Sequence, residues 1–411
     1  MSKPDLRFVV LSDIHIPPFP NSGRRVFARA LEVIANTVGQ PDLLVLAGDV
    51  VYQLDSWQDN ICRNVYEHPY DIVKDLLNQY FPGVPCMYVL GNHEFPQNND
   101  DPALTQAALE IWLRKTGQPV RAHQIVNGIH FIKYPLLTWS MPVMPEEEAW
   151  AMAELRSALA ADEGKPVFFV SHDSTGDPSY LWPEPESFSA EFREFLRKHP
   201  RIIHLSGHRH MHIADHQRIY QDGFTTVSLP CCAVGQVVMQ VTRYPHPRLK
   251  ASQSMLFEVN GSCVTAQGID HGLEGFAGDA LIIDTTALAQ GIAPYGDEAR
   301  RQMPVPEFTP DAVPAVSVQA DAIAVAVPQS FTDASPFPFY YELTVTGSDG
   351  QQVDFARYPA DFDAAFRGQP ALPAQSYPLS AQPAGTYTLS VRPLNSLRMG
   401  GTAKCVIFTV E

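Results

Sequence analysis

Several features that would place a protein in a specialised class are missing from this sequence of 411 residues. No apolar run approaches the roughly 20 residues that cross a bilayer, and the N-terminal apolar run has no small-residue cleavage site after it. We therefore expect a cytoplasmic protein with no membrane partner. The six cysteines form no CxxC pair, and Cys231 and Cys232 are adjacent, so we expect buried, reduced thiols.

Basic residues are also scarce. The chain has 29 Lys and Arg against 45 Asp and Glu, and its formal net charge is −16. Because proteins that bind long nucleic acids present basic surfaces, nucleic acid is not an expected partner. A small anion held at a locally positive site is compatible with this charge. The sequence contains neither a G-x-S-x-G motif nor a P-loop, so no nucleophilic serine motif or phosphate-cradling loop suggests itself.

The residues that are present are typical of a globular protein with more than one domain. Hydrophobic residues make up 45% of the chain and charged residues 18%. The length suggests two or three domains. The 36 prolines favour strands separated by turns over long helices.

Five short apolar runs predict strands that are buried on both faces. Amphipathic stretches lie between them at 26–34 and 145–160, and the second begins with a proline and three acids, as helices prefer. Strands that alternate with helices predict a layered α/β domain. The five predicted strands are LRFVVLSD, DLLVLAGD, CMYVLGN, VFFVSHD and IIHLSGH.

The pattern changes towards the C-terminus. Further strands after residue 210 are expected to complete an α/β domain over residues 1–275, and residues 276–310, which end in a proline cluster, are expected to be a linker. The stretches FYYELTVTGSDG and GTYTLSVRPLN then alternate apolar and polar residues. Residues 311–411 are therefore predicted to form a C-terminal all-β sandwich of fibronectin or immunoglobulin type, through which the chain could form oligomers.

Each of the five predicted strands ends in polar residues. In open α/β sheets ligands bind beyond the carboxyl ends of the strands, so these residues could meet at one place. Residues i and i+2 of an extended chain point the same way, which would let Asp13 and His15 reach one ion together, and likewise His208 and His210. The five ends are Asp13-Ile14-His15, Gly48-Asp49, Gly91-Asn92-His93-Glu94, His172-Asp173 and Gly207-His208-Arg209-His210.

The candidate ligands are two carboxylates, an amide oxygen and four imidazoles, with no thiolate. Such nitrogen and oxygen donors suit Mn, Fe, Zn, Co or Ni and disfavour Cu(I) or iron–sulfur clusters. Seven ligands are too many for one tetrahedral ion but suit two ions that share a bridge. The seven are Asp13, His15, Asp49, Asn92, His172, His208 and His210.

The motifs D-x-H, G-D, G-N-H-[DE], a lone H and G-H-x-H occur in this order as DIH, GDVVY, GNHE, VSHD and GHRH. In this the chain resembles the calcineurin-like metallophosphoesterases over residues 6–270. The resemblance implies a four-layer αββα sandwich and two transition metal ions, most readily Mn, Fe or Zn. It implies one metal on Asp13, His15, Asp49 and His210. The second would lie on Asp49, Asn92, His172 and His208, with Asp49 bridging.

The resemblance also implies a reaction. His93 would be the catalytic residue, as general acid or as a donor that stabilises an oxygen, while Asn92, His93 and Arg209 are candidate contacts for the substrate phosphate. Two ions would activate a bridging hydroxide for direct attack on phosphorus. We expect a dinuclear phosphoesterase acting on a small or medium-sized phosphate ester. The alternatives are a cyclic-nucleotide or other phosphodiesterase and, in another class, a non-catalytic binding or scaffold protein on a phosphatase fold.

Several neighbouring residues admit two roles. Tyr52 occupies the position at which purple acid phosphatases, a related group, bind ferric iron, but packing near the site is the alternative. Arg209 either contacts phosphate or forms an ion pair, and His212 is a candidate for lining the cleft. His204 is expected to be a core histidine, and Glu94 to shape its loop. The aromatic residues of the long loops, such as Trp57, Tyr180 and Trp182, could stack on a base or sugar or simply pack.

Overall fold

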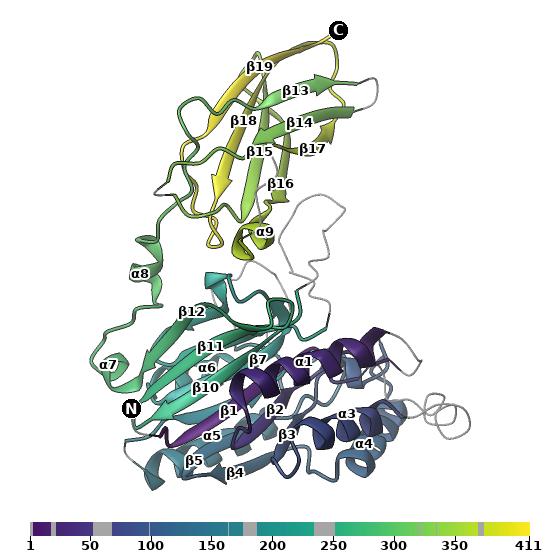
Figure 1. Cartoon of the computed structure of the whole chain (residues 1–411), viewed down its shortest axis with the longest axis vertical. Helices are drawn as coiled ribbons and strands as arrows, with labels where there is room; N and C mark the ends of the chain where they lie inside the picture. Colours follow the sequence, from purple (N-terminus) through teal and green to yellow (C-terminus); the bar gives the residue numbers. More distant parts are fainter. Residues whose placement is uncertain are drawn as a thin grey trace. The chain divides into compact units, whose positions relative to one another are not determined.

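The computed structural model divides into two compact units (Figure 1). Among the residues that the structure describes, the first unit reaches Asp297, and the second runs from Glu298 to Glu411. Each unit has a hydrophobic core of its own. The structure describes residues 3–17, 22–51, 68–97, 99–162, 164–175, 187–233, 251–319, 322–333, 335–368 and 374–411.

The first unit contains two six-stranded sheets. In the first sheet β1, β2 and β3 are parallel to one another, and β10, β11 and β12 extend it in antiparallel fashion from β1. Its strands, in spatial order, are β12 (Gly275–Asp284), β11 (Cys263–Asp270), β10 (Gln253–Asn260), β1 (Leu6–Leu11), β2 (Leu43–Ala47) and β3 (Cys86–Val89).

The second sheet has a parallel centre and antiparallel edges. β5, β6, β7 and β9 are parallel neighbours, while β4 and β8 pair antiparallel at the two edges. Its strands, in spatial order, are β4 (Ala122–Val126), β5 (Ile129–Lys133), β6 (Val167–Ser171), β7 (Ile202–Met211), β9 (Thr225–Pro230) and β8 (Ile219–Gln221).

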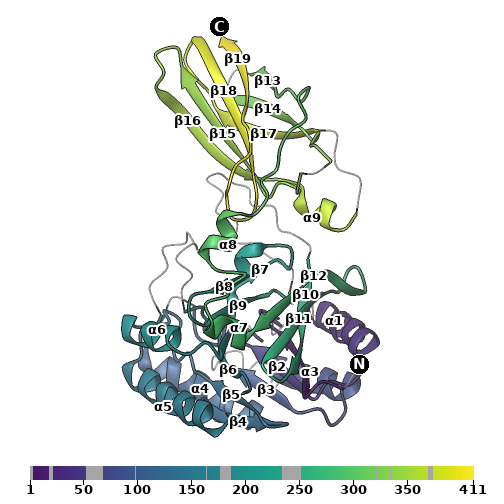
Figure 2. The same cartoon turned by 90° about the vertical axis from the view of Figure 1, so that its left-hand side faces the viewer.

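Helices cover the outer face of each sheet, which gives four layers. The helices α1 and α3 lie on the opposite side of the two sheets from α5 and α6 (Figure 2). The helices on the first sheet are α1 (Ser22–Val38), α3 (Pro69–Tyr80) and α4 (Pro102–Thr116), and those on the second are α5 (Pro145–Ala161) and α6 (Ala190–Arg197). Short elements follow or interrupt the strands, namely η1 (Asn92–Glu94), η2 (His216–Arg218), α7 (Thr285–Ala289) and α8 (Asp297–Arg301).

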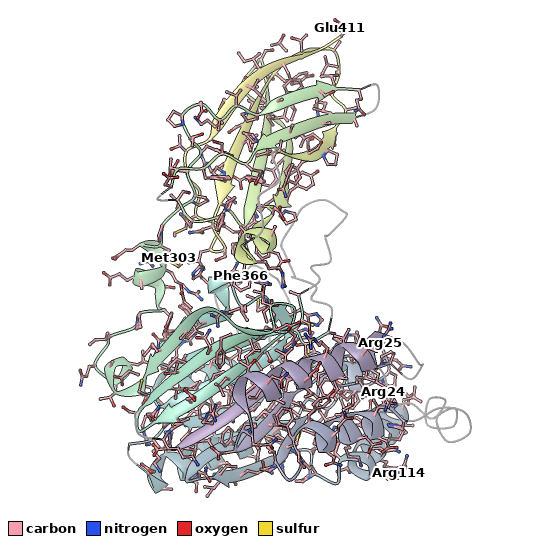
Figure 3. All side chains as sticks on the ribbon, viewed as in Figure 1. Arg24, Arg25, Arg114, Met303, Phe366 and Glu411 are labelled. Atoms are coloured by element: carbon pink, nitrogen blue, oxygen red, sulfur yellow. The ribbon has the colours of Figure 1, made fainter. Side chains whose placement is uncertain are left out.

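The strands are buried on both faces because two different cores use alternate residues. In β1, Phe8 and Val10 point into the core between the sheets, whereas Val9 and Leu11 point to the core under the helices. The Phe8 ring stacks on Phe257 with ring centroids 5.0 Å apart. Side chains fill the space between the layers (Figure 3). This arrangement confirms the five predicted strands and the predicted helices at 26–34 and 145–160, and with them a mixed α/β fold.

In the described part of the second unit, seven strands form two antiparallel sheets around one core. Alternate residues of β15, namely Tyr341, Leu343 and Val345, point into that core. One sheet contains β13 (Ala315–Val318), β14 (Ala322–Pro328) and β17 (Ala374–Ser380), and α9 (Phe362–Phe366) precedes β17. The other contains, in order, β16 (Gln352–Pro359), β15 (Tyr340–Gly347), β18 (Gly385–Leu394) and β19 (Lys404–Val410).

The first residues of the expected linker, 276–284, form a strand in the structure. Strand β12 occupies residues 275–284 and pairs with β11, so it belongs to the first sheet. Only Leu281 and Ile283 of this edge strand are buried, which is why its sequence shows little of the alternation that marks the other strands. None of the described helices is long and apolar enough to cross a membrane.

Candidate metal centre

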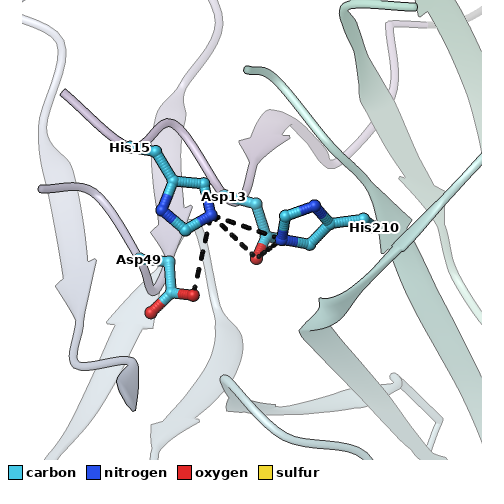
Figure 4. A group of neighbouring side chains, drawn as sticks. All are labelled: Asp13, His15, Asp49 and His210. Carbon is cyan, nitrogen blue, oxygen red and sulfur yellow. Dashed lines mark hydrogen bonds and ion pairs between the residues drawn. The ribbon is translucent and has the colours of Figure 1, made fainter. Parts of the chain in front are cut away.

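Four side chains form the first group of the candidate centre (Figure 4). One donor atom from each of Asp13, His15, Asp49 and His210 lies within 4.8 Å of the others. His210 Nε2 is 3.1 Å from Asp13 Oδ1 and 3.2 Å from His15 Nε2. His15 Nε2 is 3.8 Å from Asp49 Oδ2. These are the side chains expected to share one ion.

A second group shares Asp49 with the first. Donor atoms of Asp49, His172 and His208 also lie within 4.8 Å of one another. Asn92 adjoins this group, since its Oδ1 is 3.1 Å from His208 Nδ1. His208 and His210 therefore belong to different groups, although the i, i+2 spacing had suggested that both could reach one ion.

The backbone at these residues is not extended as the spacing argument assumed. Asp13 and His15 have φ values of 54° and 49°, Asp49 has 50°, and His208 and His210 have 64° and 46°. Residues other than glycine rarely adopt this left-handed region, and each such residue costs about 1–3 kcal/mol. At these five residues the directions of the side chains therefore do not follow the simple alternation of an extended strand.

The glycines before the ligands allow a close approach. Gly48 has a φ of 90°, and a Cβ at this position would overlap the imidazole ring of His172. A Cβ at Gly207 would overlap the hydroxyl of Ser12 and lie 3.0 Å from Asp13 Oδ2. The glycines thus let strands from the two sheets pack directly against the ligands.

The ring of His172 is oriented by a main-chain contact. Its Nδ1 lies 2.8 Å from the carbonyl oxygen of Ala47, and because a carbonyl only accepts, Nδ1 donates. Nε2 therefore faces Asp49 Oδ2, 3.1 Å away. Neither of these two atoms has a hydrogen-bond partner in the described part of the chain, although both are buried. A ring nitrogen and a carboxylate oxygen that both face one point are the donors that a cation requires.

Electrostatics indicate that the centre attracts positive charge. Burial lowers the pKa of His172, but the Asp49 carboxylate outweighs burial and raises it to about 10. Burial raises the pKa of Asp13, but His210 outweighs it and the pKa falls to about 2. Without a cation, the two buried carboxylates thus draw protons onto neighbouring imidazoles. A metal ion would supply the same positive charge, so the donor set fits one.

His93 lies beside the first group. Its ring meets the His15 ring edge to face, with centroids 4.8 Å apart, and its backbone N–H donates to Asp49 Oδ1 over 2.8 Å. Burial lowers the pKa of His93, so its ring is neutral near pH 7. On another side the ring meets Trp139, also with centroids 4.8 Å apart. Nothing in the sequence around Trp139 had marked it, because it lies in a loop with no polar motif.

Arg209 and His212 are buried and have polar neighbours outside the two groups. Arg209 is only 8% exposed, and its Nη2 lies 3.5 Å from Asp173 Oδ1. Of the two roles that the sequence allowed for Arg209, this contact corresponds to the ion pair. His212 is 1% exposed, and its Nε2 lies 3.0 Å from Gln253 Nε2. His212 is therefore part of a buried polar contact and does not line an open cleft.

His204 is a core histidine, as expected. It is fully buried between the hydroxyls of Ser171, 2.7 Å from Nε2, and Thr175, 3.1 Å from Nδ1. Burial lowers its pKa to about 3. The predictions for Tyr52, Trp57, Tyr180 and Trp182 lie outside the described residues.

The chain has a layered α/β fold, and carboxylates and imidazoles gather at the ends of its strands. These two features are typical of an α/β protein that binds metal ions. The chain belongs to the calcineurin-like phosphoesterase family, whose model matches residues 6–212. The match begins with β1 and includes all seven candidate ligands. The comparison with curated proteins gave no match.

Solved structures of low sequence identity are also similar to the chain. A predicted phosphoesterase from Streptococcus pneumoniae is 13% identical, with 69% of this chain and 98% of that chain covered and a TM-score of 0.29. Vps29 from Chaetomium thermophilum is 11% identical, with 68% and 99% covered and a TM-score of 0.31. A cold-active protein-tyrosine phosphatase from a Shewanella species is 11% identical, with 68% and 80% covered and a TM-score of 0.29.

Proposed function

We propose that the protein is a dinuclear metal-dependent phosphoesterase that hydrolyses a small or medium-sized phosphate ester. The observation that carries this proposal is the position of Asp49, whose carboxylate belongs to both groups of donor atoms. Asp49 Oδ1 accepts from the His93 backbone, while Oδ2 faces His172 and His15. A carboxylate shared in this way is suited to hold two cations side by side.

Two bound transition metal ions, with Mn, Fe or Zn the best matches to these donors, would acidify a water and polarise the oxygens of a phosphate ester. The chain contributes the placement of the other groups. The neutral ring of His93, held between His15 and Trp139, has an N–H with which to donate to the leaving oxygen. Asn92 lies beside His208 at the edge of the second group, where a phosphate oxygen would approach.

The C-terminal sandwich is proposed to be a fibronectin- or immunoglobulin-like domain. The Tyr387 hydroxyl donates to the carbonyl oxygen of Pro383 over 2.8 Å, near the start of β18. A tyrosine that bonds back to the backbone a few residues upstream, near the start of the sixth strand, is a known feature of such sandwiches. Oligomer formation through this domain is the role we propose for it.

The test is hydrolysis of chromogenic phosphate esters by metal-free protein to which Mn²⁺ is returned. We expect two equivalents of Mn²⁺ to bind and p-nitrophenyl phosphate or its bis ester to be hydrolysed, and the preferred ester decides between monoesterase and diesterase. Asp49→Asn should lose both ions and activity. Two bound ions without turnover of either ester would favour the non-catalytic binding protein instead.

A further inference from the structure

Glu94, which directly follows His93, is a fully buried carboxylate that the proposed reaction does not use. It is 0% exposed, and its side chain is not among the groups of donor atoms that could hold a metal. A buried carboxyl group calls for specific hydrogen-bond partners.

The partners of Glu94 are main-chain N–H groups of the loop that carries Asp49. Glu94 Oε2 accepts from the N–H of Asp49 over 3.1 Å and of Gly91 over 2.6 Å. Glu94 Oε1 accepts from the N–H of Val50 over 2.8 Å and of Val51 over 3.1 Å. Three successive N–H groups thus converge on one carboxylate, which is the concave arrangement of main-chain donors that binds anions.

The loops of Asp49 and Glu94 hold each other reciprocally. The Glu94 carboxylate fixes the main chain of residues 49–51, and the Asp49 carboxylate accepts from the main-chain N–H of His93 over 2.8 Å. Asp49 has a φ of 50°, so its conformation needs such support from outside. The Glu94 carboxylate supplies such support at the main-chain N–H groups of residues 49–51.

We propose that Glu94 is a positioning residue that holds Asp49 in place between two metal ions. This inference rests on the proposed function, since it concerns how the shared ligand is aimed. The Tyr70 hydroxyl, 3.3 Å from Glu94 Oε1, adds a fifth donor and belongs to α3. Helix α3 is thereby connected to the centre through Glu94.

The test compares Glu94→Gln with Glu148→Gln in metal-free protein. Glu148 is also a buried glutamate, at 4% exposure, and accepts from a main-chain N–H, that of Ser189, over 2.7 Å, but it lies on α5 under the second sheet. Both variants should unfold at a lower temperature. In Glu94→Gln the new amide N–H₂ group faces N–H donors, so we expect Mn²⁺ binding measured by calorimetry to weaken at least 10-fold. Glu148→Gln should bind Mn²⁺ within about twofold of the wild type.

A folded Glu94→Gln variant that binds two Mn²⁺ ions as tightly as the wild type would overturn the inference. If Glu94→Gln does not fold, Tyr70→Phe replaces it in the test, because this variant removes only one donor to Glu94. We expect Tyr70→Phe to weaken Mn²⁺ binding at least twofold. Unchanged affinity in Tyr70→Phe would then count equally against the inference. Failure of the wild type itself to bind Mn²⁺ would instead refute the proposed function.

Discussion

At the residue scale, the candidate centre gathers backbone conformations that side chains usually avoid. Nine described residues other than glycine have a positive φ, and five of them are Asp13, His15, Asp49, His208 and His210. Unfavourable conformations of this kind persist where the surrounding structure enforces them, and they are concentrated at functional sites. Five of the seven candidate ligands thus carry a strained backbone, and Asn92 and His172 are the two that do not.

His93 gives the residue-scale prediction. In His93→Ala the main-chain N–H that bonds Asp49 Oδ1 is retained, so the metal groups should stay intact while the ring that faces the reaction is lost. We expect Mn²⁺ affinity within about threefold of the wild type and a kcat reduced by roughly 10²–10⁴-fold. Calorimetry and steady-state kinetics measure the two quantities, and a fully active variant would refute the role of His93.

At the scale of elements, the turns that follow the strands decide the geometry. The turn after β2 brings Ala47, Gly48 and Asp49 against His172 from the end of β6, so one strand end of each sheet takes part. The contact depends on a main-chain atom at Ala47 and on the missing side chain at Gly48. A turn of any other shape would leave the His172 ring without its orienting carbonyl.

Gly48→Ala, with Gly39→Ala as the matched control, tests the importance of this turn. Both glycines have a positive φ, 90° and 77°, so both alanine variants should lose at least about 1 kcal/mol of unfolding free energy. A Cβ at Gly39 meets nothing within 4 Å, whereas one at Gly48 overlaps the His172 ring. Only Gly48→Ala should therefore lose Mn²⁺ binding, and equal affinities for the two variants would show that the close approach is unimportant.

At the scale of the whole molecule, the two units differ in their titratable groups. Residues 298–411 contain no histidine. The first unit contains His15 and His271, whose pKa values burial lowers to about 4, and His204, whose pKa burial lowers to about 3. Each of these histidines is neutral when folded and takes up a proton on unfolding below its ordinary pKa of 6.5.

This difference predicts a pH dependence that is confined to one unit. A depressed histidine pKa stabilises the fold above pH 6.5, and this stability is lost as the pH falls towards the folded pKa values of 4 and 3. Calorimetry of metal-free protein between pH 6.5 and 4.5 should show two transitions, with only that of the first unit moving to lower temperature. His204→Gln should reduce this slope, and equal slopes for both transitions would contradict the prediction.

The sequence by itself determined the elements and the donor inventory. Apolar runs of four to six residues were enough to predict β1, β2, β3, β6 and β7, because burial on both faces leaves a local signal in the sequence. The order of the polar motifs after these runs was enough to indicate the family, because motif order is read directly from the chain. The limits of β12 could not be predicted, since an edge strand with few buried residues lacks that signal.

Only the tertiary structure decided which donors meet. The contact between His15 and His210 joins residues 195 positions apart and exists because two sheets stack with their strand ends together. The separation of His208 from His210 arises where β7 loses its regular pairing with β9, between Ser206 and Met211. The inward direction of Glu94 and the position of Trp139 against His93 depend on irregular turns. Side chains on such turns follow no period, so their directions follow from packing and cannot be read from spacing.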